Sequence, residues 1–312
     1  MNYIADSLII AVLTYRRPED LQSAIPALLD QVGKSPLPTH ILVIDNDPDG
    51  GAASTVSGFD DPRLRYVHEP TPGIAAARNR ALTESRDTAL LVFIDDDEVP
   101  SENWLASLLE TYRTSGAAAV VGPVISEYAR VPDPWVAAGE FFKRRRLPTG
   151  TPLTVAATNN LLLDLDQIRA LELRFDDRFG LSGGSDTLFT RHIATSGRKM
   201  VWCDEAVVVD RVPEGRLTRE WVLRRAFRSG NGWSRVTLEL SGSIGDRVLN
   251  RAKLLGAGGI RLLGGLGRFG AGVIVRSQRH QSKGLRTAAR GAGMASGSFG
   301  YVYSEYKRNS QI

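Results

Sequence analysis

Three short runs of apolar residues dominate the first third of the chain. They lie at residues 8–13, 41–44 and 89–94, and none of them contains a charged side chain. A strand that is buried on both faces requires a continuous run of this kind. The stretches between and after these runs, at residues 18–31, 73–85 and 102–114, are predicted as helices. The alternation is typical of a parallel sheet whose two faces are covered by helices.

A second block begins near Thr154. It is predicted to contain a strand through residues 161–163, a helix near 166–172, a helix at 185–196 and a strand at 201–209. The stretch from residue 123 to 152 carries prolines and the basic run 143–146, and is predicted as an irregular surface excursion. Residues 218–228 are predicted to be helical. The second block therefore continues the α/β pattern before the composition changes.

Acidic residues follow two of the predicted strands directly. Asp45 and Asp47 come after the second strand, and Asp95, Asp96 and Asp97 come after the third. The carboxyl edge of an α/β sheet is where such folds bind ligands. Adjacent anions repel each other by roughly 1 kcal/mol per pair even in water, so a divalent cation would stabilise them. A solvated acidic loop is the alternative, but a cation held by one or two carboxylates usually completes its shell with phosphate oxygens, which favours a nucleotide.

The distribution of charge divides the chain. Residues 1–215 hold 21 Lys/Arg against 31 Asp/Glu, whereas residues 216–312 hold 18 against 4. A basic segment of this kind favours an anionic partner, and the absence of a nucleic-acid motif favours membrane lipid over nucleic acid. The single cysteine, Cys203, excludes an internal disulfide and is interpreted as a core residue. With no signal peptide expected at the N-terminus, these features favour the cytoplasm.

The glycine-rich stretch at residues 254–275 leaves two interpretations open. Its length would suffice to cross a membrane, but Arg261, Arg268 and many glycines argue against an ordinary spanning helix. An interfacial or re-entrant membrane segment is one interpretation. A glycine-rich helical hairpin that packs within the protein is the other.

The order and spacing of five motifs resemble glycosyltransferase family 2, from about residue 8 to residue 234. The motifs are residues 14–18, 45–47, 73–79, 95–97 and 183–186. A further segment, residues 212–230, resembles the succinoglycan-biosynthesis branch of that family. The resemblance implies the GT-A fold, a Rossmann-like and mostly parallel sheet with helices on both faces, followed here by a basic helical extension. It implies domains at residues 1–235 and 236–312.

The resemblance also implies the roles of the motif residues. Asp186 matches the catalytic base, and Asp97 matches the ligand of a Mg²⁺ or Mn²⁺ ion that assists departure of the nucleoside diphosphate. The remaining matched positions imply contacts with the nucleotide sugar: Thr14, Tyr15, Arg17, Asp45, Asp47, Arg78, Asp95, Asp96, Asn159 and Arg211. A carboxylate at a strand end can accept from a pyrimidine N–H or a ribose hydroxyl, and a guanidinium suits a phosphate. From the residues alone, each of three assignments has an alternative. Asp45 could form an Asx turn, Arg78 could be a surface arginine, and Asn159 could belong to a turn.

Two positions depart from the family pattern. Ser185 stands where many members carry glutamate before the catalytic aspartate, so Asp186 lacks a like-charged neighbour. Arg211 stands where relatives of the succinoglycan type commonly place histidine, and it could neutralise the diphosphate itself. The dependence on metal could then be weaker than in those relatives.

The sequence therefore predicts an inverting glycosyltransferase. Its donor would be a UDP-sugar or another nucleotide sugar, and its acceptor a hydroxyl of a glycan or a lipid-linked molecule in surface-polysaccharide biosynthesis. We expect it in the cytoplasm, peripheral to the inner face of the cell membrane. A nucleotidyltransferase is an alternative, although residues 14–18 lack the glycine that its phosphate loop normally shows. A second alternative is a membrane-docked scaffold whose sugar-nucleotide site has decayed. The residues that favour it are Ser185 and Arg211.

Overall fold

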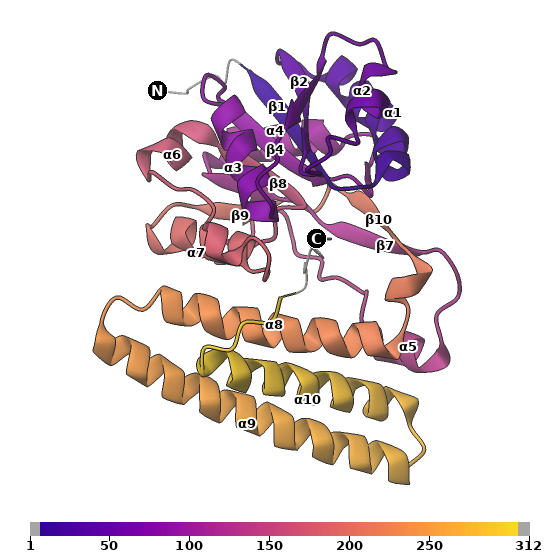
Figure 1. Cartoon of the computed structure of the whole chain (residues 1–312), viewed down its shortest axis with the longest axis vertical. Helices are drawn as coiled ribbons and strands as arrows, with labels where there is room; N and C mark the ends of the chain where they lie inside the picture. Colours follow the sequence, from indigo (N-terminus) through magenta and orange to yellow (C-terminus); the bar gives the residue numbers. More distant parts are fainter. Residues whose placement is uncertain (1–6, 305–312) are drawn as a thin grey trace. The chain divides into compact units, whose positions relative to one another are not determined.

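A seven-stranded sheet is built from strands between Leu8 and Trp202 in a computed structural model that describes residues 7–304. The strand order is β3-β2-β1-β4-β8-β6-β9 (Figure 1). The strands are β1 (Leu8–Thr14), β2 (Thr39–Asp45), β3 (Leu64–His68), β4 (Leu90–Asp95), β6 (Ala119–Val121), β8 (Asn160–Asp164) and β9 (Met200–Trp202). Only β8 runs antiparallel to its two neighbours. The sheet is mostly parallel, as predicted.

Helices cover both faces of this sheet because the strands are apolar on both sides. On β1, Leu8, Ile10 and Val12 pack on one side, while Ile9 and Ala11 pack on the other. The first side is covered by α1 (Pro18–Lys34), α2 (Ala53–Ser57) and α4 (Trp104–Ser115). The second is covered by α3 (Ile74–Glu84), α6 (Leu165–Ala170) and α7 (Ser185–Thr195). Figure 1 shows α3, α6 and α7 together on one side of the sheet.

The predicted strand at residues 201–209 was wrong, because this stretch forms two strands in different sheets. It divides into β9 and β10 (Val208–Val212), and β10 pairs with β5 (Glu98–Pro100) in a three-stranded sheet that also contains β7 (Val124–Tyr128). The division follows from two acids in the middle of the stretch, Asp204 and Glu205, which cannot lie in a buried strand. Strands β3, β5, β6 and β7 were not predicted.

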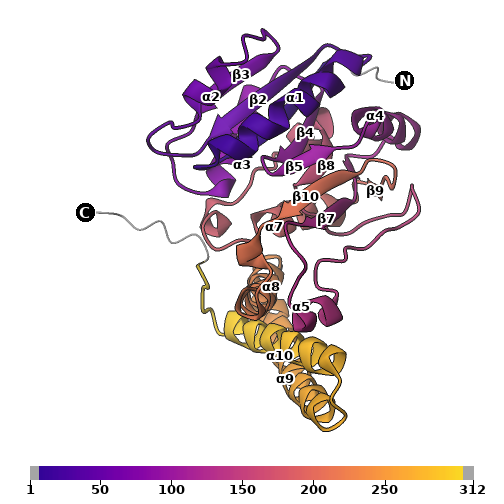
Figure 2. The same ribbon diagram turned by 90° about the vertical axis from the view of Figure 1, so that its right-hand side faces the viewer.

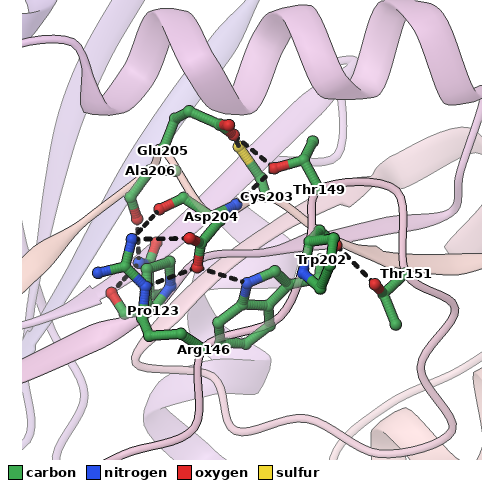
Figure 3. A network of polar contacts seen from close by, with 11 residues as sticks. Pro123, Arg146, Thr149, Thr151, Trp202, Cys203, Asp204, Glu205 and Ala206 are labelled. Atoms are coloured by element: carbon green, nitrogen blue, oxygen red, sulfur yellow. Dashed lines mark hydrogen bonds and ion pairs between the residues drawn. The ribbon is translucent and has the colours of Figure 1, made fainter.

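The acidic turn between β9 and β10 holds part of the basic excursion in place. The Arg146 guanidinium donates two hydrogen bonds to the Asp204 carboxylate, at 2.6 and 2.9 Å, and Trp202 Nε1 donates to the same carboxylate at 3.0 Å (Figure 3). The Thr149 hydroxyl donates to Glu205. Cys203 in this turn is fully buried, as the sequence predicted. The basic run is therefore anchored to the turn rather than simply solvated.

The chain divides into two compact units, and the division differs from the predicted boundary at residue 235. The first unit comprises residues 1–125, 144–180 and 185–210, and the second comprises residues 126–143, 181–184 and 211–312. The second unit contains α5 (Pro134–Gly139), α8 (Arg219–Glu239), α9 (Ile244–Ile274) and α10 (Gln278–Ser298), with the short 3-10 helix η2 (Glu214–Arg216); another, η1 (Asp177–Phe179), lies in the first unit. Helix α8 belongs with the helices that follow it, because it packs along α10.

The glycine-rich stretch lies in a single helix, α9, which forms one arm of a helical hairpin whose other arm is α10. Helices α9 and α10 pack closely along their length, as Figures 1 and 2 both show. A Cβ added at Gly258 or Gly272 on α9 would lie 2.9 Å from Gly291 O or 2.7 Å from Gln281 N on α10. The glycines thus allow the two backbones to approach. Among the described residues, no helix combines the length and the apolar character needed to cross a membrane.

Candidate active site

The carboxyl ends of β2, β1 and β4 lie side by side and bring the predicted acids to one edge of the sheet. Thr14 at the end of β1 is in register with Asp45 on β2, and Leu13 is in register with Asp95 on β4. Asn160 starts β8 on the other side of β4, opposite Ile94. Five of the predicted site residues, Thr14, Asp45, Asp95, Asp96 and Asp97, therefore end up along three adjacent strands.

Arg17 and Thr14 hold the carboxylates after β4. The Thr14 hydroxyl donates to Asp96 Oδ2 at 2.8 Å. One terminal nitrogen of Arg17 donates to Asp96 Oδ1 at 3.1 Å and to Asp97 Oδ2 at 3.0 Å. Because Arg17 lies on the surface whereas Asp96 is buried, the guanidinium closes the pair of acids from the solvent side. This arrangement joins Arg17, which was assigned to the nucleotide sugar, to Asp97, which was assigned to the metal.

Asp45 and Asp47 shape the loop after β2. The buried Asp45 carboxylate accepts from the backbone N–H of Asp47 and of Ala52, both at 2.9 Å, and from the Tyr66 hydroxyl at 3.0 Å. The Asp45 carboxylate raises the pKa of Tyr66 to about 12, after the larger contribution of burial. Asp47 pairs with Arg16 at 3.1 Å. The Asx turn considered for Asp45 is therefore present, and its contact with the nucleotide stays a prediction.

Helix α3 begins at a point where only glycine is accommodated. Gly73 caps the helix at φ 122°, in the left-handed region, and an added Cβ would lie 3.3 Å from the carbonyl carbon of Gly180. Asn46 fixes this entry, because its Oδ1 accepts from the Gly73 N–H at 3.1 Å while its Nδ2 donates to the Glu69 carbonyl. The loop after β2 is thus bonded directly to the start of α3.

Arg78 links the start of α7 to the acids after β4. Its terminal nitrogen donates to the Ser185 hydroxyl at 2.7 Å, and its guanidinium lies 5.4 Å from the centre of the Phe175 ring. The positive charge of Arg78 also acts to lower the pKa of Asp95, against a larger contribution from burial. Ser185, which replaces an acid of the family pattern, therefore serves as an acceptor for Arg78.

Asp186 occupies the first turn of α7. Its Oδ1 accepts from the Thr187 N–H at 2.7 Å, and its backbone carbonyl accepts from the Thr190 hydroxyl at 2.9 Å. Phe189 and Ile193 of the same helix are buried against the sheet with Phe93 and Phe175. The base assigned by resemblance is therefore carried on a packed helix, one residue from the serine that binds Arg78.

Glu98, Arg144 and Asp210 form part of the site that the sequence did not reveal. The buried Glu98 accepts from Asn159 Nδ2 at 2.7 Å and from the Asp95 N–H at 3.3 Å. Arg144 donates to the buried Asp210 at 2.8 Å. The signal for Glu98 was its place directly after the three aspartates, while Arg144 and Asp210 are brought together only by the tertiary fold.

Asn160 has structural contacts, whereas Arg211 is exposed. Asn160 is fully enclosed: it donates to the carbonyls of Pro123 and Ala206 and accepts from Trp104 Nε1 at 2.9 Å. Arg211 is exposed on β10, beside the buried Asp210. Adjacent residues of a strand point to opposite faces, so these two side chains do not share a face of β10. Contacts of Arg211 and Tyr15 with a nucleotide sugar stay predictions.

Crowding of carboxylates raises their pKa values. Burial, together with the charge of Asp97, raises the pKa of Asp95 to about 6. Burial raises the pKa of Asp96 to about 7, although Arg17 and Thr14 oppose the shift. Burial and the neighbouring Asp95 raise the pKa of Glu98 well above its usual range. Each of these groups therefore holds its negative charge at a cost in free energy that a nearby cation would offset.

The donor set suits a divalent cation that is bound only in part by the protein. Carboxylate oxygens are the ligands that Mg²⁺ and Mn²⁺ prefer. Within residues 7–304, no group of three His, Cys, Asp or Glu side chains is arranged to enclose a metal ion. An ion held by Asp97, the assigned ligand, would then need further oxygen ligands from the substrate and from water.

We expect the stability of the metal-free protein to fall as the pH rises from about 4 to about 7. Between the ordinary aspartate pKa of 3.8 and the raised values of about 6 and about 7, the folded protein binds more protons than the unfolded chain. The free energy of unfolding therefore decreases with pH in this window. The thermal midpoint of unfolding should decrease less steeply with pH in the Asp96→Asn variant than in Asp166→Asn, whose substitution is at an exposed site on α6. Equal slopes in both variants would contradict the assignment.

Comparison with known proteins agrees with this geometry. The model of the family described as glycosyl transferase family 2 matches residues 9–164. The succinoglycan biosynthesis protein ExoM of Rhizobium meliloti (strain 1021) is 37% identical over 236 residues, which cover 74% of this chain and 75% of that protein. The chain belongs to glycosyl transferase family 2. It is thus a glycosyltransferase, and the resemblance to the succinoglycan branch is confirmed.

A second relative and several solved structures are also similar. Glycosyltransferase AglE of Haloferax volcanii is 26% identical over 238 residues, covering 74% of this chain and 73% of its own. The mannosyltransferase PcManGT of Pyrobaculum calidifontis, in complex with GDP-Man and Mn²⁺, has a TM-score of 0.58 at 18% identity, covering 92% of this chain and 86% of that one. TarS 1-349 of S. aureus, in complex with UDP-GlcNAc, has a TM-score of 0.51 at 13% identity over 88% and 89%. These likenesses confirm the GT-A fold.

Proposed function

We propose that this protein is an inverting glycosyltransferase of surface-polysaccharide biosynthesis. It transfers a sugar from a nucleoside-diphosphate sugar, which we take to be UDP-linked, to a hydroxyl of a glycan or lipid-linked acceptor. The observation that carries the proposal is the edge of the sheet, where Asp95, Asp96 and Asp97 lie at the end of β4 next to Thr14 and Asp45 at the ends of β1 and β2. The succinoglycan relative and the nucleotide-sugar complexes of TarS and PcManGT support the same reaction class.

The residues of the edge suggest how the donor binds. Thr14 and Asp45 end adjacent strands, where they are suited to hold the nucleoside, and Asp95 and Asp96 lie next to them at the end of β4. Arg78 and Arg17 can donate to diphosphate oxygens, since a guanidinium presents paired N–H groups. Asp97 would hold Mg²⁺ or Mn²⁺, which when bound neutralises charge on the departing diphosphate. PcManGT and GalNAc-T7 are both seen in complex with Mn²⁺.

Asp186 then acts as the base in a single displacement. Its carboxylate accepts the proton of the acceptor hydroxyl while that oxygen attacks the anomeric carbon. The bond from the anomeric carbon to the phosphate oxygen breaks, and the nucleoside diphosphate leaves with the electron pair. One displacement inverts the anomeric configuration and forms no covalent intermediate with the enzyme. The Thr187 N–H bond to Oδ1 keeps this carboxylate oriented on its helix.

The anomeric configuration of the product tests the mechanism. An α-linked UDP-sugar should give a β-linked product at the earliest time point, read by proton NMR from the coupling constant of the anomeric proton. Retention of configuration would contradict the single displacement and the role of Asp186. The test uses whichever UDP-sugar the protein consumes in a screen for released UDP.

We also propose that the protein acts in the cytoplasm at the inner face of the cell membrane. The support is the excess of 18 Lys/Arg over 4 Asp/Glu in residues 216–312, together with the prediction of a lipid-linked acceptor.

A further inference from the structure

One face of helix α9 is apolar and exposed along its whole length. Ile260, Leu263 and Ile274 are 75%, 71% and 83% exposed. At 100° per residue, these three side chains fall on the face opposite Gly258 and Gly265, which pack against α10. Val248, Leu249 and Leu266 extend the same face and are also exposed. A soluble protein rarely exposes a continuous apolar surface of this length.

From Gly256 to Ile274 this outer face of α9 carries no charged residue, and Lys253 lies at its N-terminal end, seven residues before Ile260. Between its exposed Val, Leu and Ile side chains, the positions on the face are glycine or alanine, such as Gly256, Gly267 and Gly270. Helix α9 has 31 residues and is therefore about 46 Å long. From Gly256 onward the face is thus a strip without hydrogen-bonding side chains, which suits a surface that is itself apolar.

Basic residues flank the strip. Residues 244–298, which form α9 and α10, contain ten Lys/Arg and a single acid, Asp246. Arg247, Arg261 and Arg268 lie on α9 but outside the outer face, and all three are exposed. An apolar face bordered by arginines is the arrangement of a helix that lies in the interface of an anionic membrane.

A cleft of about 340 Å³ between α5, α9 and α10 concentrates this positive charge. It is lined by Lys143, Arg268, Lys283 and Arg286 together with Glu140 and Phe141. The one carboxylate is already engaged, because Glu140 accepts from Lys283 at 3.0 Å and lies 3.7 Å from Arg279. The cleft therefore has more positive charge than its single acid balances, which is the condition for binding a phosphate group.

Arg286, which lines the cleft, and Arg290, one turn further along α10, have lowered pKa values. Burial lowers the pKa of Arg286, which lies 5.7 Å from the centre of the Phe141 ring. Burial and the charges of Arg286 and Arg261 lower the pKa of Arg290, whose Nε is buried without a hydrogen-bond acceptor. An anion in the cleft would relieve the repulsion between Arg286 and Arg290.

We propose that α9 lies in the plane of an anionic phospholipid surface, with its outer face among the acyl chains and the cleft on a lipid phosphate. This deepens the location proposed above by naming the attachment surface, and it does not depend on the transfer reaction. A second copy of the chain is disfavoured as the occupant, because face-to-face pairing would bring two sets of ten cations together. An anionic lipid surface instead matches both the apolar strip and the charge.

Vesicle flotation tests the proposal on the full-length protein. The vesicles contain phosphatidylcholine alone, or phosphatidylcholine and phosphatidylglycerol in equal parts. We expect flotation only with the anionic vesicles, and at least a tenfold weaker affinity for them in the Ile260→Glu/Leu263→Glu variant, given about 1.5–3 kcal/mol per buried side chain. The matched control is Val131→Glu, because Val131 is 89% exposed in the loop before α5. It should float like the wild type.

The cleft and the oligomeric state have their own measurements. The Lys143→Glu/Arg268→Glu variant should also lose most of its affinity for anionic vesicles, whereas UDP binding should remain unchanged in all of these surface variants. Wild-type flotation in the Ile260→Glu/Leu263→Glu variant would overturn the proposal. The proposal would also be overturned if the wild type bound no vesicles and was a dimer by light scattering, and the Ile260→Glu/Leu263→Glu variant was a monomer. If the wild type did not bind UDP, the proposed function would be contradicted, and the conclusion from flotation would be unaffected.

Discussion

Replacing Asp186 with asparagine is expected to lower kcat for sugar transfer by about 10²–10⁴-fold, the usual contribution of a general base. Asparagine retains an oxygen that can accept from the Thr187 N–H, so the start of α7 should be preserved. The amide cannot take the proton of the acceptor hydroxyl. Donor binding depends on other residues in the proposal, and the affinity for UDP should therefore change little.

The control for this variant is Asp166→Asn. Asp166 is likewise an acid in the first turn of a helix of the same unit, α6, and it pairs only with the exposed Arg169 at 2.6 Å. Both variants lose a favourable charge at a helix N-terminus, worth about 0.3–1 kcal/mol in the free energy of unfolding. Initial rates at saturating donor should fall only for Asp186→Asn. Comparable rates in the two variants would exclude Asp186 as the base.

The Asn160→Ala variant should lose about 3–5 kcal/mol of the free energy of unfolding. Its side chain joins Trp104 Nε1 on α4 to the carbonyls of Pro123 and Ala206. Removing the amide leaves these three polar groups buried without their partner, and each such group costs about 1–3 kcal/mol. Urea denaturation, followed by circular dichroism, measures the loss.

Asn159→Ala is the matched control, because the adjacent asparagine has one side-chain partner, Glu98, at 2.7 Å. We expect a loss of stability of about 1 kcal/mol, as for a single hydrogen bond. The contrast separates a residue that stabilises the fold from one that faces the carboxylate cluster. If Asn159→Ala were the more destabilising of the two, the structural role given to Asn160 would be refuted.

The fold of the catalytic unit was predictable where the hydrophobic pattern has only one interpretation. The continuous runs of β1, β2 and β4 cannot be solvated, and a helix follows β1 and β2 directly and β4 after the short strand β5. The short strands β5 and β7 were missed, because three to five residues do not establish a period and their pairing with β10 is set by the tertiary fold. The strand expected at residues 201–209 failed for the same reason, since the acids Asp204 and Glu205 are held by residues distant in sequence.

The site was predictable to the extent that its residues lie at strand ends. Thr14, Asp45 and Asp95 meet because adjacent parallel strands share one edge. The contacts that the tertiary fold makes around this edge were not predictable: Arg144 reaches Asp210 across 66 residues, and Arg78 reaches Ser185 across 107. The glycines of α9 illustrate a different ambiguity. They pack against α10, yet the face opposite them remains apolar, so one pattern supports both a hairpin and a membrane surface.

Calorimetric titration of UDP into the wild-type protein, with Mn²⁺ and with EDTA, tests the central claim most directly. The Asp97→Ala variant is titrated in parallel, since Asp97 is the assigned metal ligand and is now paired with Arg17 at 3.0 Å. We predict that UDP binds the wild type in Mn²⁺, and that EDTA and Asp97→Ala each weaken binding severely. Binding of equal strength in all three conditions would contradict the metal site at Asp97. The absence of UDP binding by the wild type would contradict the assignment of UDP to the edge of the sheet.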